Sequence, residues 1–425
     1  MSAPAGWVEY QNSQLIEHGV LKIGDGYRAK RSEMGESGLP FARAANIDSG
    51  FDLEDADLLQ DESVAQAGDK LSRPGDIVFT SKGTVGRFAL VGDDTPHFVY
   101  SPQLCFWRVL DRTVISPRYL YYWMQGPDFL GQVNQVKGLT DIADYVSLTD
   151  QRAMVVRAPD LPAQIAISKA LGVYDDLINN NRRRIEILEQ KAQAIYREWF
   201  VNFRFPGHED VGMVESELGL IPEGWAAVPF SEAVEINPRL SFDKEVERPY
   251  VPMGAVSETS MIFDASDRRK GRGGARFQNG DTLFARINPS LQNGKTGFVQ
   301  FLPSDSDVAI GSTEFIVFRS RSLCPELVQL ASRSPEVRGL AIKSMVGASG
   351  RQRVQLEIFD SLLIPQPPKD LVSRSREVLA PMFELAWSLA KQNAVLRETR
   401  DLLLPRLVSG EISVEDVPVP DDSVA

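Results

Sequence analysis

The sequence predicts an α+β protein with two similar β-rich domains, each followed by a long helix. Residues 161–203 and 368–410 carry apolar side chains at alternating spacings of three and four, which is typical of helices that pair along a seam. A series of motifs in the first 160 residues also recurs after residue 224. The order domain, helix, domain, helix indicates an internal duplication.

The predicted boundaries follow from composition. The domains cover residues 1–160 and 224–367, and a linker containing Pro206, Gly207, Gly219 and Pro222, residues 204–223, separates the first helix from the second domain. An acidic tail, residues 411–425, ends the chain. In the first domain, strands are predicted for short runs of β-branched and aromatic residues bounded by turns, at 76–80, 87–91 and 104–109.

The second domain repeats the first at low identity. Gly75–Phe79 (GDIVF) matches Gly280–Phe284 (GDTLF) at an offset of 205 residues. Two further matches at an offset of 211 pair Gly86 with Gly297 and Ser101 with Ser312. The opening Gly-Trp of the first domain, at residues 6 and 7, recurs at residues 224 and 225.

Each long helix carries a narrow apolar stripe interrupted by one asparagine, which predicts a coiled-coil seam with a fixed register. A helix of this length, roughly 60 Å at 1.5 Å per residue, exceeds what a small domain can bury, so the two helices are expected to pair. A pseudo-twofold axis between the halves makes that pair an antiparallel coiled coil with a domain at each end. The seam positions are Ile178, Asn181, Ile185, Leu188, Ile195, Leu389, Asn393 and Leu396.

Composition excludes several classes of protein. The 425 residues carry a formal net charge of −12, which argues against coating nucleic acid by bulk charge but permits a local basic groove. With no long apolar run and no leader-type start, we expect a cytoplasmic protein without membrane contact. The two cysteines are expected to be buried free thiols, and three scattered histidines show no zinc spacing.

Three sets of residues resemble catalytic motifs, but none of them satisfies its motif. Asn293-Gly294-Lys295-Thr296 resembles the end of a phosphate-binding loop, but Pro289 occupies the position of its required first glycine. Ile287-Asn288-Pro289-Ser290 lacks the second proline and the aromatic residue of an amino-methyltransferase site. Asp160, Glu189 and Lys191 fit a nuclease pattern formally, but the last two lie on the long helix. We expect no catalysis by this chain.

Basic and amide side chains instead gather in glycine-containing loops of both domains. Such loops approach phosphates closely, and Arg, Asn and Gln can pair with base edges, so their repetition predicts DNA binding. The candidates in the first domain are Lys22, Arg28, Lys30, Arg31, Lys82, Thr84, Arg87, Lys137 and Thr140. Those in the second are Arg268, Arg269, Lys270, Arg272, Arg276, Arg286, Asn288, Gln292, Asn293, Lys295, Lys343, Ser349, Arg351 and Gln352.

Four stretches resemble the specificity subunit of type I restriction-modification systems. They are GTVGRFALV, YDDLINNNRRRIEILEQKAQAIYREWFVNFRFPGHE, IPEGW and LRETRDLLLPRLVSGEI, and the resemblance covers nearly the whole chain. It implies that each domain is a target-recognition domain for one half of a split double-stranded DNA sequence. It also implies that the helices set the spacer and dock two modification (methyltransferase) subunits, with restriction subunits joining the full complex.

The resemblance further implies that this chain binds no cofactor or metal. S-adenosylmethionine would lie on the modification subunits, and ATP and Mg on the restriction subunits. A separate observation concerns partners: Ile187, Tyr196, Phe200, Phe383 and Trp387 exceed what a two-stranded seam buries, which predicts a helical bundle shared with other chains. The residues alone leave one alternative open, a coiled-coil adaptor with two protein-binding modules.

Overall fold

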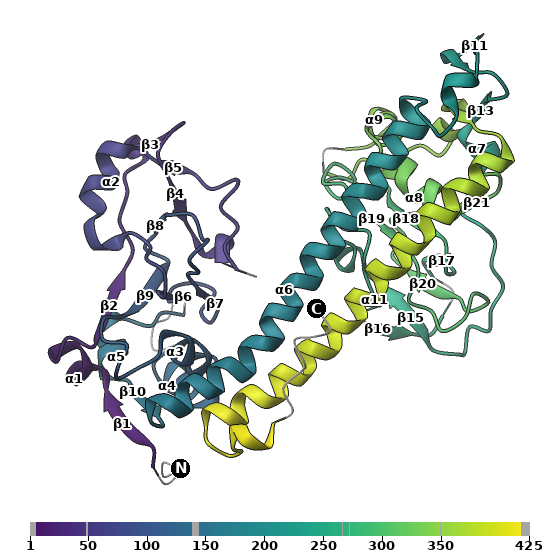
Figure 1. Cartoon of the computed structure of the whole chain (residues 1–425). Helices are drawn as coiled ribbons and strands as arrows, with labels where there is room; N and C mark the ends of the chain where they lie inside the picture. The colour runs from purple at the N-terminus through teal and green to yellow at the C-terminus, as the bar shows by residue number, and fades with distance from the viewer. Residues whose placement is uncertain are drawn as a thin grey trace. The chain divides into compact units, whose positions relative to one another are not determined.

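The computed structural model describes residues 6–47, 50–137, 144–265, 267–271, 273–348 and 350–417. The chain folds as two compact units (Figure 1). Unit 1 consists of Met1–Ile178 with Val395–Ala425, and unit 2 of Asn179–Ala394. Each of the two long helices therefore begins in one unit and ends in the other.

Unit 1 contains two small four-stranded sheets. The first, antiparallel throughout, has the order β2 (Leu21–Asp25), β9 (Leu104–Val109), β6 (Ile77–Thr80), β7 (Phe88–Leu90). The second has the order β3 (Met34–Gly35), β5 (Leu58–Leu59), β4 (Leu39–Ala42), β8 (Val99–Tyr100), with β4 and β8 parallel. A separate pair joins β1 (Val8–Gln11) to β10 (Val155–Ala158). The short helices are α1 (Asn12–Glu17), α2 (Asp61–Ala67), α3 (Pro117–Met124), α4 (Pro127–Val136) and α5 (Leu148–Ala153).

Unit 2 is built on the same plan. Its antiparallel sheet has the order β14 (Val234–Ile236), β21 (Phe315–Ser320), β18 (Thr282–Ala285), β19 (Thr296–Phe298). Its second sheet has the order β16 (Asp267–Arg269), β15 (Arg248–Val251), β20 (Ala309–Gly311), β17 (Ala275–Phe277). Two pairs remain, β13 (Ala226–Pro229) with β22 (Leu363–Gln366) and the hairpin β11 (Met213–Ser216) with β12 (Gly219–Pro222). The short helices are α7 (Phe230–Ala233), α8 (Pro325–Arg333), α9 (Pro335–Lys343) and α10 (Ile358–Ser361).

The strand registers confirm the duplication and correct one of its matches. Thr80 pairs with Leu104 in unit 1 as Ala285 pairs with Phe315 in unit 2, which preserves the offsets of 205 and 211. Between these strands the match of Gly86 with Gly297 is wrong. The register Phe79 with Phe88 and Phe284 with Thr296 makes Gly294 the equivalent of Gly86, and both glycines have positive φ. The cause is a β18–β19 loop three residues longer than the β6–β7 loop, an insertion that one shared offset cannot represent.

A buried arginine–aspartate pair links the two central strands of each antiparallel sheet. In unit 1, Arg108 donates from Nε and Nη2 to the two carboxylate oxygens of Asp76, at 2.7 Å each. Asp76 is fully buried and also accepts from the Tyr100 hydroxyl at 2.6 Å. In unit 2, Arg319 makes the same paired contact with Asp281 at 2.8 and 2.7 Å. Bidentate geometry of this kind is what makes a buried charge pair tolerable.

The two long helices confirm the sequence prediction. The first, α6 (Leu161–Tyr196), continues into a π-helical turn at Arg197–Val201, and α11 spans Lys369–Val408. They lie side by side (Figure 1). In unit 2 the two seam asparagines meet, because Asn181 Nδ2 donates to Asn393 Oδ1 at 3.0 Å. Asn181 Nδ2 also donates to Gln392 Oε1 at 2.9 Å.

An ion pair and apolar packing hold the two helices together in unit 1. Arg400 of α11 donates to Asp175 of α6 at 2.5 Å, and Asp175 also accepts from the Tyr122 hydroxyl of α3. Leu171 and Leu404 belong to one buried cluster with the sheet and with α3. The helices are thus part of each unit's core as well as partners of each other.

Two of the aromatic residues expected to be exposed on the helices are buried instead. Phe200 and Phe383 are 5% and 1% exposed, because the β-rich part of unit 2 covers them. Phe383 packs edge-on against Phe298, and Phe200 packs against Trp225. Tyr196 and Trp387 are half-buried, so of the five only Ile187, at 39%, is exposed. These residues therefore give weak support for an external helical bundle.

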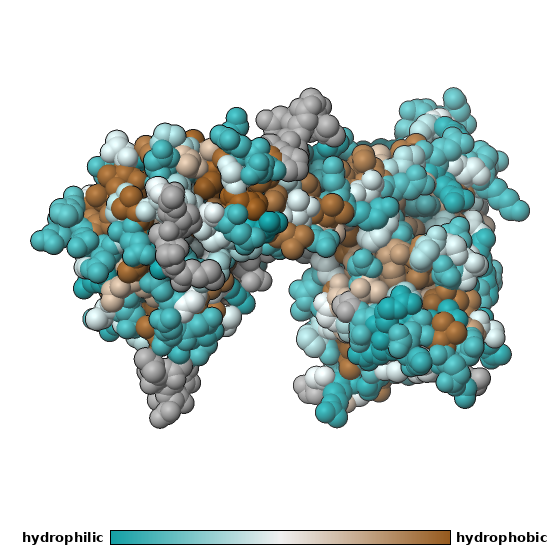
Figure 2. Space-filling view, turned by 90° about the horizontal axis from the view of Figure 1, so that it is seen from below, coloured by the Kyte–Doolittle hydropathy of each residue, from teal (hydrophilic) through white to brown (hydrophobic). Residues whose placement is uncertain are grey.

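The remaining core follows the sequence prediction. Trp107, Trp123 and Trp225 are buried, as are the free cysteines Cys105 and Cys324. Burial raises the pKa of the Cys324 thiol to about 12, which keeps it protonated and unreactive. Figure 2 shows hydrophilic residues over much of the visible face of each unit, interrupted by small hydrophobic patches. Among the described residues, no helix is long and apolar enough to cross a membrane.

We predict that replacing Asp76 by Ala lowers the free energy of unfolding of unit 1 by about 3–5 kcal/mol, because Arg108 would remain buried without its counter-charge. The double replacement of Asp76 by Leu and Arg108 by Met removes both charges and is expected to recover most of this loss. Urea denaturation monitored by hydrogen exchange of the β6 and β9 amides measures both variants. Equal losses in the two variants would contradict the buried-charge explanation.

Candidate nucleic-acid interface

Two loops of unit 2 that were predicted separately as DNA-binding lie against each other. The first, residues 286–295, joins β18 to β19, and the second, residues 345–353, follows α9. Ile287 forms a β-bridge with Arg353, and Asn288 Nδ2 donates to Gln352 Oε1 at 3.0 Å. The backbone amide of Asn288 also donates to the Gln352 carbonyl. The structure therefore places two amide side chains of the kind that can read base edges beside each other.

An ion pair braces this loop pair. Arg353 donates from Nη2 to Glu314 Oε1 at 2.7 Å and from Nε to Oε2 at 3.0 Å. Hydrogen bonding from Arg353 lowers the pKa of Glu314 below its ordinary value. The backbone amide of Arg286 donates to the Glu314 carbonyl, and the Val354 amide donates to the Arg286 carbonyl. Both loops are thereby tied to the turn that precedes β21.

Unit 1 has a loop pair at the equivalent place. The β6–β7 loop contains Lys82, Thr84 and Arg87, and Lys82 forms a β-bridge with Tyr145, as Ile287 does with Arg353 in unit 2. The Gly83 amide donates to the Asp144 carbonyl, and the guanidinium of Arg87 donates to the Ala44 carbonyl at 3.1 Å. A loop that follows the central strand is thus braced by a distant segment in both units.

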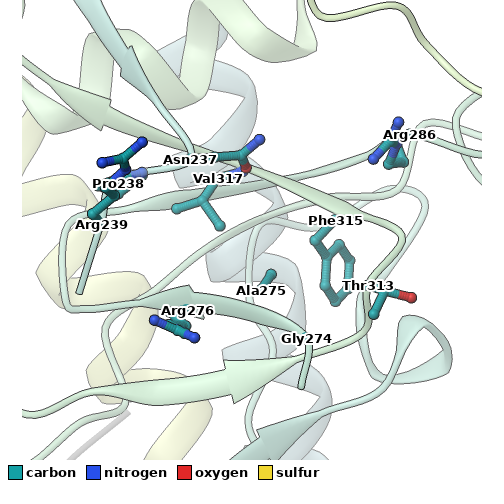
Figure 3. Close-up of a pocket in the computed structure, with 10 residues that line it drawn as sticks. All are labelled: Asn237, Pro238, Arg239, Gly274, Ala275, Arg276, Arg286, Thr313, Phe315 and Val317. Carbon is teal, nitrogen blue, oxygen red and sulfur yellow. The ribbon is translucent and has the colours of Figure 1, made fainter. Parts of the chain in front are cut away.

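A pocket of about 340 Å³ opens beside the loop pair of unit 2 (Figure 3). Its lining comes from four separate segments: the residues after β14, the start of β17, the residue after β18, and the turn leading into β21. In Figure 3 Arg239 and Arg276 lie on one side, Arg286 and Thr313 lie on the other, and Phe315 and Val317 lie between them. The lining residues are Asn237, Pro238, Arg239, Gly274, Ala275, Arg276, Arg286, Thr313, Phe315 and Val317.

Local contacts position the arginines of this pocket. Arg276 donates to the Leu240 carbonyl at 2.9 Å, and its guanidinium lies 5.2 Å from the centre of the Phe242 ring. Arg239 is exposed. The Nε of Arg286 is buried, with no hydrogen-bond partner among the described residues. Asn237 adopts a left-handed conformation with φ of 52°, in which its Oδ1 accepts from the Val317 amide at 3.0 Å.

Sequence reasoning missed Asn237, Arg239 and Thr313. Each is an ordinary polar residue in its own segment, and only the fold brings the three together. One signal was available: Asn237, Pro238 and Arg239 directly follow a short strand of the repeated sheet. Side chains at that position lie next to the loops that leave the same sheet edge.

Other candidates are held by contacts within the protein. Lys22 forms an ion pair with Asp69, and Asn293 donates to Glu258. Arg269 pairs with Asp267 and lies 3.6 Å from the centre of the Tyr250 ring. Arg268 and Lys295 donate to the backbone carbonyls of Glu247 and Met253, respectively.

The remaining candidates differ in exposure, and three cannot be placed. Lys137 is half-buried at the end of α4. Those with exposed side chains are Arg28, Lys30, Arg31, Lys270, Gln292, Lys343 and Arg351. Thr140, Arg272 and Ser349 lie outside the described residues. No observation tests any of these candidates for DNA contact, and they stay predictions.

The acidic residues of the formal nuclease pattern have structural contacts. Asp160 accepts from the Ala163 amide at 3.0 Å in the first turn of α6. Glu189 accepts from Ser260 Oγ at 2.8 Å and from the Met261 amide at 2.6 Å, and burial raises its pKa. In the described part of the chain, no group of three or more His, Cys, Asp or Glu side chains could hold a metal ion.

Comparisons with known proteins point to one family, although no family model matches. The type I restriction enzyme MjaIX specificity subunit of Methanocaldococcus jannaschii is 22% identical over 379 residues, covering 84% of this chain and 82% of the relative. The HindI specificity subunit of Haemophilus influenzae is 21% identical over 408 residues, covering 81% and 88%. The EcoEI specificity subunit of Escherichia coli is 29% identical over 196 residues, covering 44% of this chain and 33% of the relative.

Over most of its length the chain is thus similar to specificity subunits of type I restriction enzymes. A solved structure agrees at the level of the fold. The S subunit of a type I restriction-modification system from M. genitalium superposes with a TM-score of 0.56 at 13% identity, covering 96% of this chain and 98% of that structure.

The ion pair that braces the loop pair leads to a pH prediction. The pKa of Glu314 is lowered in the folded protein, so its ion pair with Arg353 contributes stability above the ordinary pKa of 4.5 and loses it as the pH falls through the lower folded value. The amides of Val346 and Arg353, which donate to each other's carbonyls, should keep their hydrogen-exchange protection at neutral pH and lose it in acid.

In the Glu314→Gln variant the same two amides are expected to exchange faster already at neutral pH, with little further change on acidification. Glu357→Gln, which neutralises an exposed carboxylate at the start of α10, is the matched control and should behave as the wild type does. Unchanged exchange in Glu314→Gln would show that the ion pair does not brace the loops.

Proposed function

We propose that this chain is the specificity subunit of a type I restriction-modification complex, and that each of its units binds one half of a bipartite DNA target without catalysis of its own. The observation that carries the proposal is the braced loop pair, which occurs at the same place in both units and is rich in cationic and amide side chains. Both loop pairs are joined by a β-bridge at the equivalent position, while their side chains differ: Lys82, Thr84 and Arg87 in one, and Asn288, Gln292 and Gln352 in the other. Two similarly braced loop pairs that carry different side chains suit two different half-sites.

The helices α6 and α11 are proposed to set the spacer and to dock two methyltransferase subunits. Support for a ruler comes from the paired Asn181 and Asn393, since a polar contact in an apolar seam fixes register. Support for docking comes from apolar side chains that stay exposed on α11. In unit 2 these are Val378 and Leu385, and in unit 1 Val395 and Leu402, the last two 62% and 65% exposed.

The cofactors follow from this division of labour. S-adenosylmethionine is proposed to bind to the methyltransferase subunits, and ATP and Mg to the restriction subunits of a full cytoplasmic complex. This specificity subunit would then contribute binding energy and geometry only. Its contacts with DNA phosphates would determine register, and its contacts with base edges would determine sequence.

Mapping methylated adenines in a host that co-expresses this chain with its methyltransferase partner tests the proposal. We expect a split sequence motif with a fixed gap, present only when this chain is included. Methylation that is unchanged when the chain is omitted would contradict the proposal and favour the adaptor alternative.

The ruler is tested by deleting residues 178–184 from α6 together with residues 390–396 from α11. These segments face each other in the register set by Asn181 and Asn393, so the remaining seam positions keep their partners. Seven residues shorten a helix by about 10 Å and keep its faces in phase. We expect the gap in the methylated motif to shorten by about three base pairs, at roughly 3.4 Å each, with both half-sites unchanged.

Deleting only residues 178–184 is the matched control, because it breaks the register and should abolish methylation. An unaltered gap in the double deletion would mean that the helices do not set the spacer.

A further inference from the structure

We propose that the arginine-lined pocket of unit 2 binds a phosphate group of the DNA backbone, an inference that rests on the proposed function. The pocket brings Arg239, Arg276 and Arg286 around one opening (Figure 3). None of its described lining residues is acidic. Guanidinium groups keep their charge at every physiological pH and match the geometry of phosphate oxygens, so the ligand class is an oxyanion.

One carboxylate beside the pocket is already engaged in an ion pair. Glu314 lies next to the lining residue Thr313, but both of its oxygens accept hydrogen bonds from Arg353. Because Arg353 already supplies a counter-charge to Glu314, this carboxylate does not keep Arg239 and Arg286 from contacting an anion.

The uncharged polar groups of the lining supply a second argument. Thr313 and Asn237 add a hydroxyl and an amide, both of which bind phosphate oxygens readily.

The shape of the pocket selects the DNA backbone over base edges. Base edges lie on the floor of a groove, where only a protruding side chain or loop can reach them. A concave site instead receives a group that protrudes, and on a duplex the sugar–phosphate backbone is what protrudes. The loop pair with Asn288 and Gln352 is thus suited to bases, and the neighbouring pocket to a phosphate. In this arrangement Arg286 contacts phosphate, in place of the base edge for which its type also qualifies.

The three arginines of the pocket have no counterpart at the equivalent described positions of unit 1. By strand register, the unit 1 positions equivalent to Arg239, Arg276 and Arg286 are Gly26, Leu71 and Ser81. No guanidinium is present at any of the three. Lys70 of unit 1 lies nearby, but it donates to Asp25 at 2.9 Å and to the Gly26 carbonyl at 2.8 Å. The duplication therefore kept the sheet and changed the charge beside it, which makes the phosphate contact specific to one half-site.

The test measures DNA affinity of the complex assembled with its methyltransferase subunits, as a function of salt. Each phosphate contact contributes about 0.9 to the slope of log affinity against log salt. In Arg239→Gln we expect the slope to fall by about 0.9, and affinity to fall by the same factor for the target and for DNA with either half-site altered. Arg321→Gln, an equal charge loss at the opposite end of β21, is the matched control and should leave the slope unchanged.

A second pair of variants separates charge from shape. Thr313→Glu places a carboxylate in the pocket lining, while Thr313→Gln adds a similar volume without charge. We expect strong loss of DNA affinity in the first and a small effect in the second. Equal losses in both, or a loss in Arg239→Gln confined to one base pair, would overturn the phosphate assignment.

Inorganic phosphate distinguishes the backbone from a free anion. If the DNA-free complex binds phosphate tightly through Arg239 while the DNA salt slope of Arg239→Gln equals that of the wild type, the pocket serves a soluble anion and the inference fails. If the wild-type complex shows no salt-dependent DNA binding at all, the proposed function itself fails. A reduced slope in Arg239→Gln against an unchanged Arg321→Gln supports both.

Discussion

The buried arginine–aspartate pair is the interaction on which both halves of this protein depend. Asp76 and Asp281 stand at the start of a central strand, and Arg108 and Arg319 reach them from the neighbouring strand. Two charges in a core are stable only when their oxygens and protons find partners, which allows very little shift between the strands. That register fixes where the β6–β7 and β18–β19 loops leave the sheet. An interaction in the core thereby determines the position of surface loops proposed to read DNA.

Most of the fold prediction rests on the periodic spacing of apolar residues. The spacing in α6 and α11 located both helices to within a few residues, because a seam repeats over ten turns and tolerates local exceptions. The match of Gly86 to Gly297 failed because a three-residue insertion in a loop leaves no periodic signal. The burial of Phe200 and Phe383 was missed for a different reason. A helical pattern shows that a side is apolar, but the same pattern fits coverage by a second helix or by a sheet.

The candidate site could likewise be predicted only in part from the sequence. Asn288 and Gln352 could be selected from the sequence by residue type and by their glycine-containing loops, although their contact required the fold. Lys22 shows the limit of this reasoning, since its charge is engaged by Asp69, far away in the sequence. The pocket was beyond prediction because its arginines come from separate segments. In each segment an arginine on the surface is unremarkable, and only their convergence has chemical meaning.

Comparison of the two halves separates support from recognition. Positions that are alike in both units, such as the aspartate and arginine of the buried pair, lie inside the sheet and have no proposed part in DNA recognition. Positions that differ, such as Arg286 against Ser81, lie at the edge where the loops emerge. Substitutions in one loop pair can therefore leave the other undisturbed, since each loop pair is braced within its own unit. The asymmetry of the arginine pocket is then a consequence of the architecture: similar supports permit unlike surfaces, as the proposed binding of two different half-sites requires.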